Sequence, residues 1–143
     1  MTADAMARPV PLPTPVSQPF WDGLARGEVW IQYSPSLDRY IFYPRVLAPG
    51  TLADDLLWRR IPGTGTLVSF TVAARPVAPQ FADAVPQLLA VVAFDEGPRL
   101  ATELVDVDPA GLRIGMRLRP VFVARPDDGV TLLHFTAEHG HPA

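Results

Sequence analysis

Arginine and aromatic side chains gather in one short segment, at Arg39, Tyr40, Phe42, Tyr43 and Arg45. A guanidinium group can pair with a phosphate through two parallel hydrogen bonds, and an aromatic ring can stack on a planar base. The segment therefore indicates a site for an adenine ring and its phosphates. The competing interpretation is that the rings form a small hydrophobic core and the arginines are simply solvated. Because side chains alternate along a strand, both interpretations can hold.

Residues 75–87 supply two further candidates, Arg75 and Phe81. This connection is long and contains three prolines. Long loops in compact domains often carry function. Phe81 is accordingly a candidate contact for a ligand or a partner, and packing over its own domain is an equal alternative.

The segment 32–51 has the outline of a zinc ribbon, with a strand, a knuckle, an aromatic strand and a proline-rich second knuckle. A working ribbon carries a C-x-x-C pair in each knuckle. The corresponding positions here are Ser34, Leu37, Ala48 and Thr51. None of them supplies the thiolate or neutral imidazole that structural zinc requires. We therefore expect no zinc, and a hairpin held by apolar contacts among Trp30, Tyr40, Phe42 and Trp58.

Residue types for catalysis are sparse. The chain has no cysteine, its serines lie outside any G-x-S-x-G turn, and its carboxylate pairs fall in predicted turns. His134, His139 and His141 lie within eight residues of one another but have no recognisable second shell. The sequence thus predicts no catalytic residue, no metal ligand and no enzyme activity of its own.

Charge and composition narrow the function further. Lys and Arg together number 12, all of them arginine, against 15 Asp and Glu residues, so the formal net charge is −3. Such a chain has no general attraction to nucleic acid or to an anionic membrane. It has neither an apolar run of about 18 residues nor the apolar region of a signal peptide, so we expect no membrane span and a cytoplasmic location.

The first 61 residues indicate an arm, a helix and a hairpin. Residues 1–16 end in PVPLPTPV, which favours an extended arm that is either a loose tail or a partner-binding segment. A short helix is predicted next, with Ser17 or Gln18 as its cap, Pro19 in its first turn and Gly27 at its exit. VWIQY and YIFY read as a hairpin, and LLWRRI as a further strand.

Five strands follow, at 67–75, 88–95, 99–107, 116–125 and 130–138. A short helix capped by Asp108 separates the third strand from the fourth. This order matches an OB-fold, a five-stranded Greek-key barrel. The predicted fold class is thus mainly β, with a short N-terminal helix and a degenerate, metal-free zinc-ribbon-like hairpin before an OB-fold barrel. The expected divisions are an arm at 1–16, helix and ribbon at 17–61, the barrel at 62–138 and a tail at 139–143.

Across about residues 17–138, the chain resembles the OB-fold family known as domain of unknown function 35. The resemblance lies in the order of PFWDGLARGEVWIQYS, DRYIFYPR, GTGTLVSFTV, FADAVPQLLAVVAFDEGPRLATELVDVDPAGLRIGMRLR and DDGVTLLHF. Family members carry a rubredoxin-like zinc ribbon before the barrel, and this sequence departs from them by lacking the four ribbon cysteines.

The resemblance implies a non-catalytic accessory subunit of lipid, steroid or polyketide-type acyl-CoA metabolism. Such a subunit docks on a thiolase-like or hydratase enzyme and helps to bind the acyl-CoA. The expected contacts for CoA or the partner enzyme are the candidates drawn from the residues themselves, Arg39, Tyr40, Tyr43, Arg45, Arg75 and Phe81. By the analogy, the nucleotide end of the acyl-CoA lies near Arg39, Tyr40 and Arg45. No cofactor is expected, and acyl-CoA is the possible ligand.

An OB-fold that binds single-stranded nucleic acid is the alternative function. It requires a basic groove with aromatic residues on the central strands. The strands at 88–95 and 99–107 offer one aromatic residue, Phe94, and one cation, Arg99, among several carboxylates. We therefore predict no nucleic-acid partner.

Overall fold

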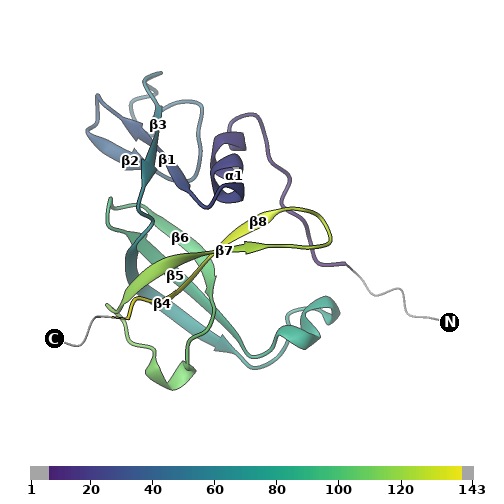
Figure 1. Ribbon diagram of the computed structural model, residues 1–143. Coiled ribbons are helices and arrows are strands. Elements are labelled where there is room, and N and C mark those ends of the chain that lie inside the picture. Colours follow the sequence, from purple (N-terminus) through teal and green to yellow (C-terminus); the bar gives the residue numbers. More distant parts are fainter. Residues whose placement is uncertain (1–6, 140–143) are drawn as a thin grey trace.

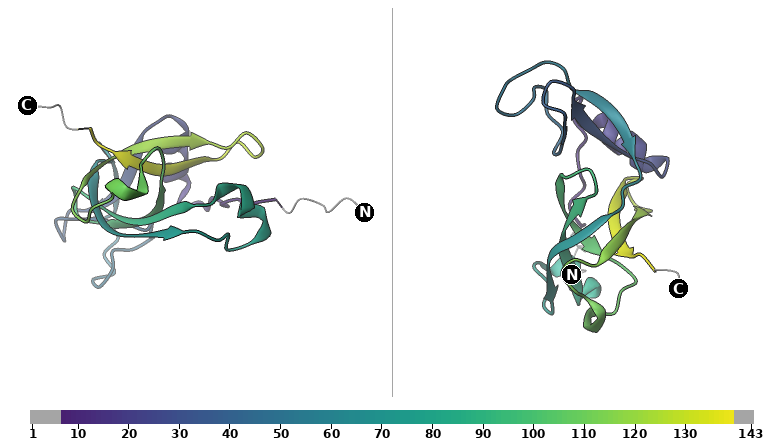
Figure 2. Two further views of the ribbon diagram at one scale, coloured as in Figure 1. Left: turned by 90° about the horizontal axis from the view of Figure 1, so that it is seen from below. Right: turned by 90° about the vertical axis from the view of Figure 1, so that its left-hand side faces the viewer.

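The computed structural model describes residues 7–139 of the chain. An extended N-terminal arm leads into one short α-helix, a small three-stranded sheet and a five-stranded barrel (Figure 1). The helix and the small sheet lie together on one side of the barrel (Figure 2). The architecture is therefore mainly β, as the sequence predicts. No helix between residues 7 and 139 is long and apolar enough to cross a membrane.

Helix α1 (Gln18–Ala25) begins and ends where local signals predict. Pro19 stands in its first turn, where a missing N–H costs no hydrogen bond. Ser17 occupies the N-cap position, but its hydroxyl accepts a hydrogen bond from the Thr14 N–H at 2.9 Å instead of from the helix. At the other end Gly27 has φ +74°, a left-handed conformation that favours glycine and ends the helix.

The small sheet contains β1 (Val29–Ser34), β2 (Arg39–Ile41) and β3 (Leu57–Ile61) in the order β2-β1-β3. β1 and β2 form the predicted hairpin, with Tyr33 opposite Tyr40. β3 follows a long loop and pairs antiparallel with the other edge of β1. β1 is consequently the central strand and the most buried of the three.

The barrel strands are β4 (Gly65–Ala73), β5 (Gln87–Phe94), β6 (Arg99–Leu104), β7 (Arg117–Ala124) and β8 (Thr131–Ala137). They pair in the order β4-β5-β6-β8-β7, and β7 closes back on β4. The contact between β6 and β8 is parallel. This closed five-stranded topology is the predicted OB-fold.

Two 3-10 helices lie in the connections of the barrel. η2 (Pro109–Gly111) is the predicted capped turn, because the Asp108 carboxylate accepts the Ala110 N–H at 3.0 Å. η1 (Pro79–Ala84) falls where the sequence predicts only an irregular connection. The three prolines of the connection favour an irregular loop on propensity, although one of them, Pro79, is suited to the first turn of η1.

One corner of the barrel depends on a glycine and an ion pair. Gly65 pairs with both β5 and β7, and a Cβ atom there would lie 2.4 Å from the Ala93 carbonyl oxygen. Next to it, the Arg117 guanidinium bonds to both carboxylate oxygens of Asp95, at 2.6 and 2.8 Å. Arg117 is the main cause that lowers the pKa of Asp95 to about 2.

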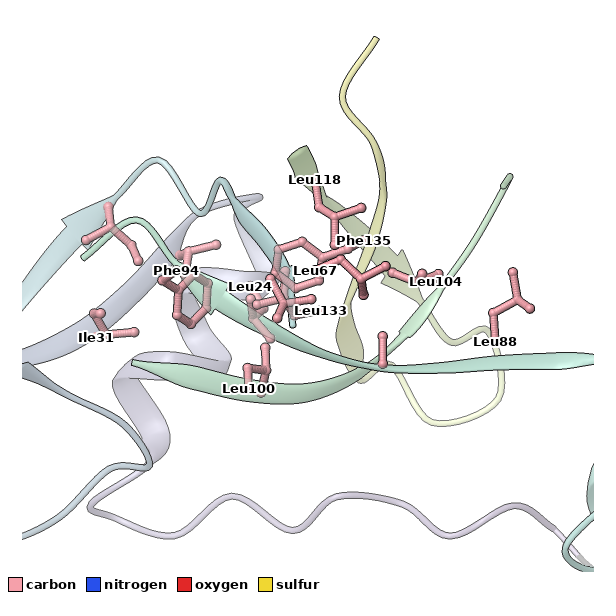
Figure 3. Close-up of a cluster of buried hydrophobic side chains, with 14 of the residues drawn as sticks. Leu24, Ile31, Leu67, Leu88, Phe94, Leu100, Leu104, Leu118, Leu133 and Phe135 are labelled. Atoms are coloured by element: carbon pink, nitrogen blue, oxygen red, sulfur yellow. The ribbon is translucent and has the colours of Figure 1, made fainter. Parts of the chain in front are cut away.

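A continuous hydrophobic core joins the helix, the small sheet and the barrel. Leu24 of α1 and Ile31 of β1 are fully buried in the same cluster as Leu67, Leu118 and Phe135 of the barrel (Figure 3). Removing this apolar surface from water is the main stabilising contribution to the fold. The small sheet therefore keeps a fixed position on the barrel through shared packing.

The N-terminal arm is anchored to the barrel near its described start. Arg8 forms an ion pair with Asp83 at 2.6 Å, and its guanidinium lies 5.2 Å from the centre of the Phe81 ring. From the β7–β8 hairpin, Arg125 donates to the Pro9 carbonyl at 2.8 Å. Residues 8 and 9 are therefore held against the barrel and are not part of a loose tail. The predicted arm and tail also include residues 1–6 and 140–143, which lie outside the described range.

Candidate functional site

The six predicted contact residues do not form a single pocket. Arg39 and Tyr40 of β2 line a cleft of about 400 Å³ beside the β5–β6 turn, which we call the arginine cleft. Tyr43 lies on a second and larger cleft. Arg75 and Phe81 belong to the connection between β4 and β5, and this connection runs away from the small sheet (Figure 1).

Arg45 is fixed through its main chain. The buried side chain of Gln32 accepts the Arg45 N–H at 2.7 Å and donates to the Arg45 carbonyl at 2.8 Å. These two bonds hold the loop after β2 against β1. The Arg45 residue remains exposed, so its guanidinium can reach an anion in solution.

Beside the arginine cleft, the side chains of Arg59, Tyr33 and Tyr40 lie in a row of contacts. The Arg59 guanidinium lies 3.7 Å from the centre of the Tyr33 ring, and that ring lies 5.0 Å from the Tyr40 ring. The Tyr33 hydroxyl donates to the Asp38 carboxylate, which raises the pKa of Tyr33. The sequence indicates the aromatic residues but not this stack, because Arg59 reaches Tyr33 only through the pairing of β3 with β1.

The larger cleft has a volume of about 670 Å³ and lies between the arm, α1 and strands β5, β6 and β8. We call it the apolar cleft, because its walls include Leu12 of the arm, Trp21 of α1, Leu100 of β6 and Leu132 of β8. Small-molecule sites commonly measure roughly 300–1,000 Å³ and are mainly apolar. Phe42 lines both clefts, so the two adjoin at this residue.

A few polar groups interrupt the lining of the apolar cleft. The Tyr43 hydroxyl accepts the Ala101 N–H at 3.5 Å. Nδ1 of His134 is buried and has no hydrogen-bond partner among residues 7–139. Burial lowers the pKa of His134, against a smaller opposing effect of Glu103. The imidazole is therefore neutral at neutral pH.

A hydrogen-bond cluster occupies the first ligand position of the ribbon. Ser34 is fully buried, and its hydroxyl donates to Asp55 Oδ1 at 2.9 Å. Asp55 Oδ2 accepts the Ser36 N–H at 2.9 Å, and the Leu37 N–H bonds to Ser34 Oγ at 3.4 Å. Hydrogen bonds from Ser36 are the largest cause that lowers the pKa of Asp55. One carboxylate thus links the first knuckle to the segment before β3.

These donors do not fit a structural zinc ion. They are hydroxyl, amide and a single carboxylate, whereas such sites use thiolate and imidazole. Of the other ligand positions, Ala48 is buried and Thr51 is exposed. Between residues 7 and 139, no three His, Cys, Asp or Glu side chains are grouped closely enough to hold a metal ion. That zinc is absent from the protein stays a prediction.

The apolar contacts predicted to replace the metal are arranged only partly as expected. Tyr40, Phe42 and Trp58 pack against the hydrophobic core. Trp30 instead packs on α1, where a Cβ atom at Gly23 would lie 2.6 Å from the indole ring.

Asp55 and His134 escape prediction from the sequence. Turn formation is a sufficient explanation for a carboxylate in a loop. The sequence therefore gives no indication that Asp55 accepts a hydrogen bond from Ser34, which lies 21 residues away. His134 stands in an ordinary strand pattern, and its surroundings come from the distant β6 and α1. The apolar pair Phe20 and Trp21, large for a helix of two turns, is the one local signal that points to the apolar cleft.

Comparison with known proteins finds a matching family model and two similar curated proteins. A family model described as ChsH2, C-terminal OB-fold domain matches residues 58–123. The chain is 34% identical over 115 residues to the 3-oxo-4,17-pregnadiene-20-carboxyl-CoA hydratase alpha subunit of Mycobacterium tuberculosis, covering 76% of this chain and 34% of that subunit. The chain thus spans about a third of that relative. It is also 30% identical over 91 residues to a DUF35 domain-containing scaffold protein of Methanothermobacter thermautotrophicus, covering 62% of this chain and 68% of that protein.

Two solved structures share the architecture. A chain of the Ltp2-ChsH2(DUF35) aldolase is 26% identical with a TM-score of 0.77, and the match covers 90% of this chain and 98% of that one. A DUF35 family protein from Sulfolobus solfataricus is 13% identical with a TM-score of 0.62, covering 87% and 86%, which supports the fold alone. By sequence and by fold, this chain belongs to the DUF35 family of OB-fold proteins.

Proposed function

We propose that this protein is a non-catalytic accessory subunit that docks on an enzyme of acyl-CoA metabolism and helps to bind its substrate. The match to the Ltp2-ChsH2(DUF35) aldolase carries the proposal, because it covers 98% of that chain. The match also covers 90% of this chain. The names of the two curated relatives, a hydratase subunit and a scaffold protein, support the same role.

The partner in this proposal is a thiolase-like or hydratase enzyme that acts on a CoA thioester. One relative is named for a carboxyl-CoA hydratase and one solved complex for an aldolase. Both names describe chemistry beside a carbonyl group. A bound accessory chain can contribute to such a reaction by orienting the thioester, which requires no catalytic residue of its own.

The nucleotide end of the acyl-CoA is assigned to the arginine cleft. Phosphate groups on a protein of net charge −3 require local cations. Arg39 lines this cleft opposite the acidic Glu96, and the exposed Arg45 follows β2 outside the lining. Neither arginine forms an ion pair within residues 7–139, so both guanidinium groups are available to pair with a phosphate. Tyr40 offers a ring for the adenine, and Tyr43 lies towards the apolar cleft.

Arg75 and Phe81 belong to a different surface in this proposal. They belong to the connection between β4 and β5, whereas the arginine cleft is lined by β2 and the β5–β6 turn, and we assign them to the enzyme partner. Arg75 is exposed and Phe81 is half-buried beside the Arg8 guanidinium. Arginine and aromatic residues are types that interfaces favour.

Co-expression with enzymes of acyl-CoA metabolism from neighbouring reading frames tests the proposal. We expect joint elution in size-exclusion chromatography at micromolar concentrations. Arg75→Ala and Phe81→Ala should weaken joint elution, and Arg113→Ala, a matched exposed arginine, should not. Separate elution of the wild-type proteins, with the enzyme's activity unchanged, would argue against an accessory role.

A further inference from the structure

We propose that residues 10–13 of the N-terminal arm form a strap that opens and closes one side of the apolar cleft, and that Arg8 and Arg125 are the positioning residues that hold it closed. The use of the cleft by a substrate rests on the proposed function. The opening of the strap can be tested on this chain alone, with no enzyme present.

The strap forms one wall of the apolar cleft. Pro11 and Leu12 are part of the lining, together with residues of α1, β5, β6 and β8. The Leu12 residue is 85% exposed, so it is not packed into the hydrophobic core. Within residues 7–139, the strap itself forms no hydrogen bond. The wall is therefore kept in place by the bonds that hold the chain on either side of it.

The first anchor holds residues 8 and 9 to two separate parts of the barrel. The Arg8 guanidinium bonds to the Asp83 carboxylate at 2.6 Å and to the Gln80 carbonyl at 3.1 Å, both in η1. Arg125, which follows β7, donates to the Pro9 carbonyl at 2.8 Å and to the Arg8 carbonyl at 3.4 Å. One side chain and two carbonyl groups thus fix the start of the strap.

This first anchor is weak enough to open. The side chains of Arg8 and Asp83 are 40% and 83% exposed, so water and salt screen their ion pair. Arg125 is only 18% exposed, and an ion pair with Asp128 at 3.0 Å orients its guanidinium within the hairpin. Arg125 therefore keeps its position when residues 8 and 9 leave, and it can receive them again.

The second anchor is local and remains in place. The N–H groups of Ser17 and Gln18 donate to the Thr14 carbonyl at 3.0 and 2.8 Å, and the Thr14 N–H donates to the Ser17 hydroxyl at 2.9 Å. These bonds join close neighbours in sequence and do not depend on the barrel. Prolines at positions 11 and 13 stiffen the chain between the two anchors. Release of the first anchor therefore swings the strap as a unit about Thr14.

A strap of this kind changes the rates of binding more than the affinity. A ligand enters and leaves only while the strap is open, so a larger open fraction raises the association and dissociation rates together. A fixed wall that merely contacts the ligand behaves differently, because its loss raises the dissociation rate alone. The two rates measured side by side distinguish these arrangements.

Stopped-flow fluorescence of the isolated chain with N-phenyl-1-naphthylamine, a neutral apolar dye, provides the test. Arg8→Ala should raise both rate constants by about three- to tenfold and leave the affinity within about threefold of wild type. Asp83→Asn should do the same by a smaller factor, and so should Arg125→Lys, which keeps the charge but lacks the second donor nitrogen. Arg113→Ala, at an exposed arginine outside the anchors, should change neither rate.

Two further measurements connect the effect to the ion pair between Arg8 and Asp83. Arg8→Asp should raise both rates, and the double variant Arg8→Asp/Asp83→Arg should bring them back towards wild type. An increase in salt from about 0.05 M to about 0.5 M should raise both rates of the wild-type chain and leave those of Arg8→Ala unchanged. Circular dichroism confirms that each variant is folded.

Unchanged rates in Arg8→Ala, or a rise in the dissociation rate alone, would overturn the strap and leave the arm as a fixed wall. Failure of the wild-type chain to bind the dye would also overturn it, because a cleft with an opening wall admits an apolar probe. None of these results bears on co-elution with an enzyme, so the proposed accessory function is judged separately.

Discussion

The Ser34 hydroxyl lies 2.9 Å from the Asp55 carboxylate, and Ser34 is the position that the sequence predicts to correspond to the first thiolate of a zinc ribbon. The Leu37 N–H bonds to the Ser34 oxygen, as a knuckle amide would bond to a ligand sulfur. A carboxylate and a hydroxyl group therefore connect the turn after β1 to the segment just before β3. The small sheet keeps its place beside the arginine cleft through these bonds and the shared hydrophobic core.

The first prediction concerns this pair. Ser34→Ala should lower the free energy of unfolding by about 1–3 kcal/mol, because it removes a buried hydrogen bond to a charged group. Asp55→Asn should also destabilise the fold. Ser69→Ala, at an exposed serine of β4, is the matched control and should stay within about 0.5 kcal/mol of wild type. Urea denaturation measures all three, and equal stability of Ser34→Ala and Ser69→Ala would refute the role of Ser34.

The second prediction is that the small sheet is independent of metal. Protein purified without a histidine tag should contain less than stoichiometric zinc, and a chelator should leave its melting temperature unchanged. The reason is that the donors around Ser34 are oxygen and amide groups. Elemental analysis and thermal melts check this, and a chelator-induced fall in melting temperature would contradict it.

The third prediction follows from the ion pair at the corner of the barrel. The folded pKa of Asp95, about 2, lies below its ordinary value of 3.8. The pair with Arg117 therefore stabilises the fold above about pH 4, and its contribution is lost as the pH falls towards 2. The two side chains are 47% and 41% exposed, so solvent screening keeps this contribution to stability small.

Asp95→Asn should accordingly reduce stability near neutral pH and flatten its decline in acid. Denaturant titrations at a series of pH values measure both effects. Asp54→Asn, at an exposed carboxylate in the loop before β3, is the control. The same acid profile in wild type and Asp95→Asn would show that the pair does not contribute.

The fourth prediction concerns the arginine cleft. Arg39→Ala and Arg45→Ala should each weaken binding of an acyl-CoA to the assembled complex by about 1.5–3 kcal/mol, a roughly ten- to hundredfold loss. The cause is the loss of a charge-assisted bond to phosphate. Calorimetric titration provides the affinities, with Arg113→Ala as the matched exposed arginine. Unchanged affinity in both variants would leave these arginines as solvated surface groups.

Local signals in the sequence predict much of the fold. Pro19 and Gly27 delimit α1, and Asp108 caps η2, because each acts on its immediate neighbours. The OB-fold is recognisable from the order of five strands and one short helix. The pairing of β3 with β1 cannot be predicted from the sequence. The loop at 42–56 separates β3 from the hairpin, and no tight turn sets the register of the two strands.

The candidate site is harder to predict because it arises between distant segments. Tyr43 and His134 share the apolar cleft although 90 residues of sequence lie between them. The composition of the segment at 39–45 suggests a ligand, but strand alternation and the turn after β2 send Tyr40 and Tyr43 to different clefts. Arg75 and Phe81 are residue types that suit a ligand or partner contact, but neither lines the arginine cleft or the apolar cleft. Residue type alone does not predict this separation.

Turnover by a reconstituted complex tests the accessory role most directly. The rate of thioester conversion by the co-purified enzyme is measured as this chain is added in increasing molar ratio, and the chain is also assayed alone. The account predicts no turnover by the chain alone, and a change in the enzyme's kcat or KM that saturates at a fixed ratio of the two proteins. Thioester turnover by the chain alone, or an enzyme whose kinetics do not respond to it, would contradict the account.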